Sequence, residues 1–257
     1  MVPTSSWRDP YSTNGDREKP DVVATGMRLR LWGWDNTLLT GQQGTSYAAP
    51  QVAGLAALLT NADPMLRHAP EVVKAILMAS ALHNVDGPPT LGPTTDTRDG
   101  AGGIDGDWAV IAARTRYQSG TGCRTSCWAQ GATSLMAPGS ARSYSFFALA
   151  GQRVRGAVAW WATADSEPYA AEVLDNDLDL QVKLGSSPLY TPWSTSTSMD
   201  NNVELVDFVA PSTGWYTLEV EKSLRTRTDA PMTPYGVAII TTRQTFIPFV
   251  VGSEEEP

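Results

Sequence analysis

The sequence changes character near Tyr117, and this change constrains the fold more than any other feature. Before Tyr117, apolar residues recur at the three- and four-residue spacings of helices. After it, they alternate over short runs rich in aromatic and β-branched residues. We therefore expect a largely helical first part and an all-β second part.

In the first part, the sequence predicts one short extended run at residues 21–24, followed by helices. The stretch Ser46–Thr60 is apolar on all sides, which is typical of a buried helix, and Pro50 costs little in its first turn. A second helix is expected to begin at Pro70, and a third is expected over Ile104–Arg114 after a glycine-rich entry.

The second part is expected to form an antiparallel sandwich or jelly roll, because its short strands are separated by Gly and Pro. The expected strands are Ser143–Leu149, Val154–Trp161, Leu178–Leu184, Val203–Val209, Trp215–Val220 and Tyr235–Thr241. The expected division is 1–118 for the first domain, 119–127 for a linker, 128–247 for the β domain and 248–257 for an acidic tail.

Charge and hydropathy exclude some partners. Lys and Arg number 19 against 27 Asp and Glu, which gives a formal net charge of −8 and argues against binding to nucleic acid or anionic lipid. The longest apolar run, Val52–Leu59, is far shorter than the roughly 18 residues of a membrane helix. Residues 1–10 have neither the basic start nor the apolar stretch of a signal peptide.

Two cysteines, Cys123 and Cys127, lie four residues apart without a neighbouring histidine, so a zinc site is not expected. A small disulfide in an oxidising compartment and a pair of free thiols in a loop are equally simple interpretations.

Acidic and amide residues gather around one expected strand of the β domain. Alternation places Asp177 and Asp179 on the same face, opposite Leu178 and Leu180. Their hard oxygen ligands predict a calcium site, with a solvated polar face as the alternative. The candidate ligands are Asp175, Asp177, Asp179, Asp200, Asn202 and Glu204.

Ser46 is the strongest candidate for a catalytic residue. It stands where a glycine-containing loop enters the first expected helix, and a helix N-terminus favours developing negative charge. That position suits a nucleophile that attacks a carbonyl, since backbone N–H groups can hold the oxyanion. An isolated serine before a helix is more often an N-cap.

The whole string from Gly44 to Gly54, Gly-Thr-Ser-Tyr-Ala-Ala-Pro-Gln-Val-Ala-Gly, resembles the serine motif of the subtilisin-like serine proteases at every fixed position. Two neighbouring strings, residues 19–26 and 100–105, also resemble that family. The motif residues that support the assignment of Ser46 are Gly44, Thr45, Ala48 and Pro50.

The resemblance implies that Ser46 is the nucleophile and a backbone donor to the oxyanion in an α/β domain with a parallel sheet. It also implies an Asp, a His and an oxyanion Asn upstream of the serine, and none of the residues before Ser46 matches them. Neither His68 nor His83 matches the family's histidine. We therefore expect the C-terminal part of a serine endopeptidase domain that is inactive alone and needs the missing N-terminal part.

The β domain resembles the C-terminal sandwich of some secreted subtilases, through strings such as residues 177–182 and 210–220. This implies an extracellular protein that hydrolyses polypeptides through an acyl-enzyme on Ser46. The alternative is a non-catalytic carbohydrate-binding or adhesion module with a relic protease segment, for which Trp193 and Trp215 are the candidate contact residues. Of the adjacent residues Trp160 and Trp161, at least one is expected in the core.

Overall fold

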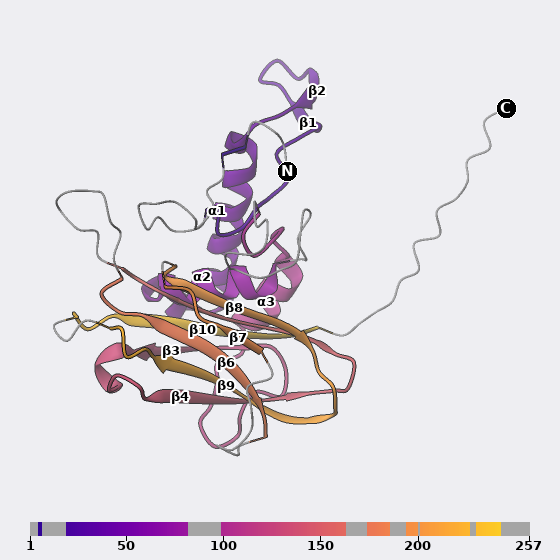
Figure 1. Ribbon diagram of the computed structural model, residues 1–257. Coiled ribbons are helices and arrows are strands. Elements are labelled where there is room, and N and C mark those ends of the chain that lie inside the picture. The colour runs from indigo at the N-terminus through magenta and orange to yellow at the C-terminus, as the bar shows by residue number, and fades with distance from the viewer. Residues whose placement is uncertain are drawn as a thin grey trace.

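A layer of helices covers two stacked β-sheets in the computed structural model (Figure 1). The structure describes residues 5–6, 19–81, 99–162, 174–185, 194–199, 201–226 and 230–242. The predicted acidic tail, together with His83, Trp193 and Asp200, lies outside these residues.

The helical layer contains the three predicted helices and a short 3₁₀ helix. They are α1 (Thr45–Ala62), η1 (Pro64–His68), α2 (Pro70–Ser80) and α3 (Gly106–Ala113). Asp63 ends α1 and caps η1 by accepting a hydrogen bond from the Met65 amide at 3.0 Å. At α3 the Asp105 carboxylate accepts from the Trp108 amide at 3.1 Å.

The β domain consists of two four-stranded sheets in which every neighbouring pair is antiparallel. The first sheet, in spatial order, contains β3 (Cys127–Ala132), β10 (Pro234–Thr242), β5 (Arg153–Trp160) and β8 (Val203–Val209). The second contains β4 (Ala141–Ala148), β9 (Gly214–Lys222), β6 (Leu178–Leu184) and β7 (Ser194–Ser196). All the predicted strands are present, and β3 and β7 are additional.

The parallel sheet implied for the first domain is not found in the described residues. Their remaining strands, β1 (Leu29–Trp32) and β2 (Leu38–Gln42), form an antiparallel hairpin. The short run predicted at residues 21–24 contributes one isolated parallel bridge, from Val23 to Gly103. The described chain is therefore mostly antiparallel β with few helices, because its long runs of backbone pairing all lie in the two β-domain sheets and the hairpin.

Two apolar cores share the first sheet. One lies between the two sheets and includes the buried residues Phe146, Leu180 and Tyr216. The other lies between the helices and the opposite face of the first sheet, where Leu59 and Ile76 belong to the same cluster as sheet residues. The sheet residues of this second core are Trp128, Ala157, Ala159, Val203, Leu205, Ala238 and Ile240. The helical layer and the first sheet are therefore packed through one continuous core.

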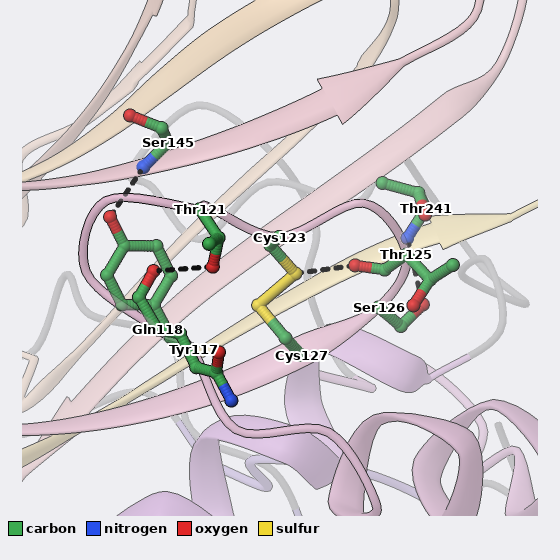
Figure 2. The surroundings of a disulfide bond; sticks show 9 residues. All are labelled: Tyr117, Gln118, Thr121, Cys123, Thr125, Ser126, Cys127, Ser145 and Thr241. Atoms are coloured by element: carbon green, nitrogen blue, oxygen red, sulfur yellow. Dashed lines mark hydrogen bonds between the residues drawn. A yellow bond between two sulfur atoms is a disulfide. The ribbon is translucent and has the colours of Figure 1, made fainter.

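The predicted linker is tied to both sheets, and it contains a disulfide between Cys123 and Cys127 (Figure 2). Cys123 donates its amide to Ser145 of β4 and accepts from Phe147 of the same strand, both at 2.8 Å. The Ser126 hydroxyl accepts from the Thr241 amide of β10 at 3.1 Å. Of the two interpretations that the sequence left open, the disulfide is the one found.

An ion pair also joins the helical layer to the segment that leads into β3. The buried Asp63 carboxylate accepts hydrogen bonds from Nε and Nη2 of Arg116, at 2.6 and 2.5 Å. The Arg116 guanidinium lies 5.3 Å from the ring centroid of Trp128. These hydrogen bonds hold the pKa of Asp63 below its usual range against the opposing effect of burial.

This ion pair predicts a pH-dependent stability. A carboxyl whose pKa is depressed by folding contributes stability above its unfolded pKa of about 3.9, and the contribution is lost as pH falls through the folded pKa. Wild type should therefore be more stable than Asp63→Asn near neutral pH, and the gap should close in acid. Urea unfolding across the acid range measures this gap. Arg116→Met should flatten the same dependence, and a gap that does not vary with pH would contradict the assignment.

Candidate functional site

Ser46 lies in the first turn of α1, and its residue is exposed. Gly44, with φ of 147°, is the N-cap, so Ser46 is the second helical residue and the N-cap interpretation is wrong. The first N–H groups of a helix have no partner within it, and the Ser46 amide is one of them. The hydroxyl and the amide of Ser46 are thus both placed at the positive end of an 18-residue helix.

A crossing segment holds the serine loop in place. The Gly44 amide donates to the Gly26 carbonyl at 2.8 Å. From α1, the Gln51 side-chain amide donates to the carbonyls of Thr25 and Tyr47, each at 2.7 Å. A Cβ on Gly26 would lie 3.0 Å from the Gly44 carbonyl oxygen, so glycine allows this close approach. The function of Gln51 was not predicted, because only the folded contact with Thr25 reveals it.

A groove of about 930 Å³ runs between this segment and α1. Its walls are mostly small apolar residues, with charged groups from residues 19–21 and Asp99 also among them. The apolar lining consists of Pro20, Val22, Val23, Ala24, Gly26, Gly44, Ala48, Ala49, Val52, Ala53 and Ala56. Thr45, the neighbour of Ser46, is part of the same wall, so the groove reaches the serine turn.

The described residues bring no imidazole to Ser46. His68 ends η1, beyond the opposite end of α1. An 18-residue helix is about 27 Å long, so His68 cannot reach the serine hydroxyl. Asn36 is in the β1–β2 turn, where its amide donates to the Gly33 carbonyl. In the part of the chain that the structure describes, Ser46 thus has the helix N-terminus but no imidazole to act as general base.

The prediction that α1 is a buried helix is wrong. Only Leu55 and Leu59 are buried in it, and Leu58 is 58% exposed. The described helices pack against α1 along one side, so its apolar character extends to solvent on the other. Figure 1 shows α1 standing out from the sheets with β1–β2 at its far end, and this hairpin carries the exposed Trp32 and Trp34. Exposed apolar surface of this kind is typical of an interaction site.

The acidic cluster predicted to bind calcium is only partly described. Leu178, Leu180 and Val182 are buried and Asp179 is half-buried, as the alternation predicts, whereas Asp177, which directly precedes β6, is buried and does not belong to a solvated face. Glu204 is fully buried, and its oxygens accept from the Ser196 hydroxyl and the Ser198 amide. Burial raises the pKa of Glu204, and it raises the pKa of Asp179 to about 6 with the help of the Asp177 charge.

These groups do not yet form a metal site. Among the described residues, no group of three or more His, Cys, Asp and Glu side chains is placed to hold a metal ion. Asp200 lies outside them, and the Asn202 amide donates to the Trp160 carbonyl at 2.7 Å. Calcium binding stays a prediction.

The tryptophans of the β domain have different surroundings. Trp160 is buried and donates its indole N–H to the Asn176 carbonyl at 2.9 Å, whereas Trp161 is exposed, which confirms that one of the pair is core. The Trp215 ring lies against the disulfide loop, 5.6 Å from the Arg124 guanidinium. A Cβ on Gly122 would lie 2.6 Å from that ring. Trp215 therefore helps to hold this loop on β9.

Comparison with known proteins relates the serine segment to one family. Residues 2–105 match the model of the subtilase family. A stretch of 104 residues is 35% identical to subtilisin-like protease SBT1.9 of Arabidopsis thaliana, and it covers 35% of this chain and 14% of the plant protein. The chain therefore spans a small part of that relative.

Two solved structures resemble the chain over about half its length. A periplasmic inhibitor of g-type lysozyme from Aeromonas hydrophila is 15% identical with a TM-score of 0.33, over 50% of this chain and 95% of that protein. The pre-peptidase C-terminal domain of a Bacillus anthracis collagenase is 15% identical with a TM-score of 0.30, over 46% and 90% respectively. Likenesses at these TM-scores define neither a common fold nor a common function.

None of the helices in the described residues is long and apolar enough to cross a membrane.

Proposed function

We propose that this chain carries the nucleophile, Ser46, of a subtilisin-like serine endopeptidase. One observation carries the proposal: within the segment that matches the subtilase model, the serine is exposed at the N-terminus of a long helix. The substrate is a polypeptide, and the reaction is hydrolysis of a peptide bond through an acyl-enzyme on the Ser46 hydroxyl.

The chemistry follows from the position of Ser46. Its Oγ attacks the carbonyl carbon of the scissile bond, and its own amide at the helix N-terminus donates to the oxyanion that forms. An unassisted hydroxyl is a poor nucleophile at neutral pH, so a general base must accept the Oγ proton and later protonate the leaving amine. Gly44 and Ala48 leave room for a substrate backbone beside the serine.

The general base, its orienting carboxylate and a second oxyanion donor come, in this proposal, from polypeptide other than the described residues. The exposed side of α1 and the hairpin with Trp32 and Trp34 offer apolar surface on which such a part could pack. Without such a part, we expect Ser46 to have no base to activate it and the chain not to turn over substrate.

A fluorophosphonate probe tests this proposal, because it reacts with activated serines. We expect no labelling of the purified chain and labelling of Ser46, mapped by mass spectrometry, when the upstream half of the catalytic domain is added. Ser46→Ala should abolish the restored label. Labelling of the chain alone would show that a base already reaches Ser46.

Absence of label in both conditions would favour the alternative, a non-catalytic binding or adhesion module. That alternative predicts saturable binding to a polysaccharide, lost in Trp215→Ala and unchanged in Ser46→Ala.

We further propose an extracellular location, which the disulfide supports, because such bonds persist in oxidising compartments.

Calcium at the acidic cluster would add stability to the loops around β6. We expect added calcium to raise the melting temperature of the chain and chelation to lower it, with Asp179→Asn reducing the difference. Carboxylates near one another repel, so a bound cation would relieve that repulsion. Equal melting temperatures with calcium and with chelator would remove calcium from the proposal.

A further inference from the structure

Arg155 is a cation buried between the first sheet and the helical layer. It lies on β5 and is 3% exposed. Its neighbour Gly156 faces the other sheet, since a Cβ there would contact Leu218, so Arg155 faces the helices. A buried guanidinium is costly unless each of its sides is paired or hydrogen-bonded. The partners of Arg155 therefore indicate its role in the structure.

Among the described residues, one carboxylate and two carbonyls lie at the three nitrogens of this guanidinium, and the charge of the buried Asp99 also acts on it. Nε pairs with the Asp207 carboxylate of β8 at 3.1 Å. Nη2 donates to the Ala101 carbonyl at 2.8 Å, and Nη1 donates to the Ala81 carbonyl. The planar fork of arginine can serve a carboxylate and two carbonyls together, which the single ammonium of lysine cannot do in the same geometry.

The two carbonyls belong to the helical layer. Ala81 is the C-cap of α2, and Ala101 is in the glycine-rich turn that precedes α3. This turn is paired with the segment beside the groove: the Ala101 amide donates to the Asp21 carbonyl at 2.9 Å, and the Val23 amide donates to Gly102 at 3.0 Å. A Cβ on Gly100 would lie 2.1 Å from the Pro20 carbonyl oxygen, so the two backbones touch.

The same segment continues to the serine. It runs from Asp21 to Gly26, whose carbonyl accepts the Gly44 amide two residues before Ser46. Asp21 is also anchored by Lys74 of α2, at 2.9 Å. Contacts are therefore unbroken from Asp207 through Arg155 and the glycine-rich turn to the serine loop.

We propose that Arg155 is a positioning residue through which the first sheet fixes the loop that carries Ser46. The β domain then acts as a support for the serine site and is not a separate module beside it. This inference rests on the contacts of Arg155 and does not require Ser46 to be a nucleophile, so the labelling experiment and the following one can fail independently.

Hydrogen exchange of the full chain, read by mass spectrometry, tests the proposal. In Arg155→Lys and Arg155→Met, peptides that cover residues 19–26, 41–46 and 99–104 should exchange about tenfold faster, because they lose the anchor for the turn. Peptides from β4 and β9 report on the other sheet, and their exchange should change by less than about twofold. The matched control is Arg153→Lys, because Arg153 pairs with the same Asp207 carboxylate at 2.7 Å. It should leave all three peptides near their wild-type rates.

A merely structural role gives a different pattern. If exchange in the Arg155 variants rises equally in every peptide, or rises in none, the proposal is wrong. Should both Arg155 variants fail to fold, Asp207→Asn keeps the two carbonyl hydrogen bonds and weakens their anchor, together with the Arg153 pair that Arg153→Lys tests separately. It should then give a smaller increase confined to the same peptides, and a uniform increase would overturn the proposal.

Discussion

Gly236→Ala should push α2 away from the first sheet and lower the free energy of unfolding by about 3 kcal/mol. This value is at the upper end of the destabilisation that overpacked cores show. Gly236 lies on β10, beneath the start of α2. A Cβ at this position would lie 2.4 Å from both the amide nitrogen and Cα of Val72, and 2.5 Å from the carbonyl carbon of Glu71. These are backbone atoms, so no side-chain rotation relieves the clash and α2 itself must move.

Urea unfolding measures the effect, and the chain offers a glycine with the opposite expectation. Gly54 lies within α1, and a Cβ there would meet no atom within 4 Å beyond the backbone of its own helix. Gly54→Ala should therefore gain up to about 1 kcal/mol, because alanine favours a helix interior over glycine. If the two variants unfold at similar urea concentrations, α2 does not lie against β10 as closely as described.

The local patterns of the sequence predicted elements well, because the spacing of apolar residues is a property of each segment alone. The helix at Pro70 and the strands at Leu178–Leu184 and Val203–Val209 were found where predicted. The β1–β2 hairpin was missed although Met27, Leu29 and Leu31 alternate with Arg28 and Arg30, because this alternating run is short and β2 is mostly exposed without such alternation. β3 was missed because its six residues contain no β-branched side chain.

What covers an apolar surface was not predictable from the same patterns. α1 is apolar on all sides, yet burial requires a partner on each side, and the described residues supply one only along the Leu55 and Leu59 face. The strands β5 and β10 show the opposite case, in which both faces of an apolar element are covered. They are buried almost without interruption, as strands covered on both faces are, and this indicates a layer on each side of the sheet.

In the candidate site, too, some features were predictable from the sequence and others were not. Ser46 was identified because its motif is contiguous in the sequence, and the helix N-terminus follows from the same stretch. The groove, Gln51 and Arg155 could not be identified, because each depends on contacts between residues far apart in the chain. The Gln51 side chain reaches Thr25, and Arg155 reaches Ala101.

The largest effect is expected when the β domain is separated from the helices. A chain of residues 119–247 would expose the helix-facing side of the first sheet, including Leu205 and Ile240, which are 2% and 1% exposed in the intact chain. Exposed apolar sheet surface favours association, so we expect this piece to aggregate and to show no monomer in size-exclusion chromatography with light scattering.

Polar substitutions on that face should reverse the outcome. Leu205→Thr with Ile240→Thr removes apolar surface that only the helices cover, so it should increase the monomer fraction of the 119–247 piece. The same pair in the full chain should cost about 4 kcal/mol or more, because two buried side chains lose their apolar contacts and two hydroxyls enter the core. The double substitution can improve the behaviour of the 119–247 piece and destabilise the full chain only if the helices and the sheet share a core. A 119–247 piece that is monomeric and folded without substitutions would instead make residues 119–127 a linker between independent domains.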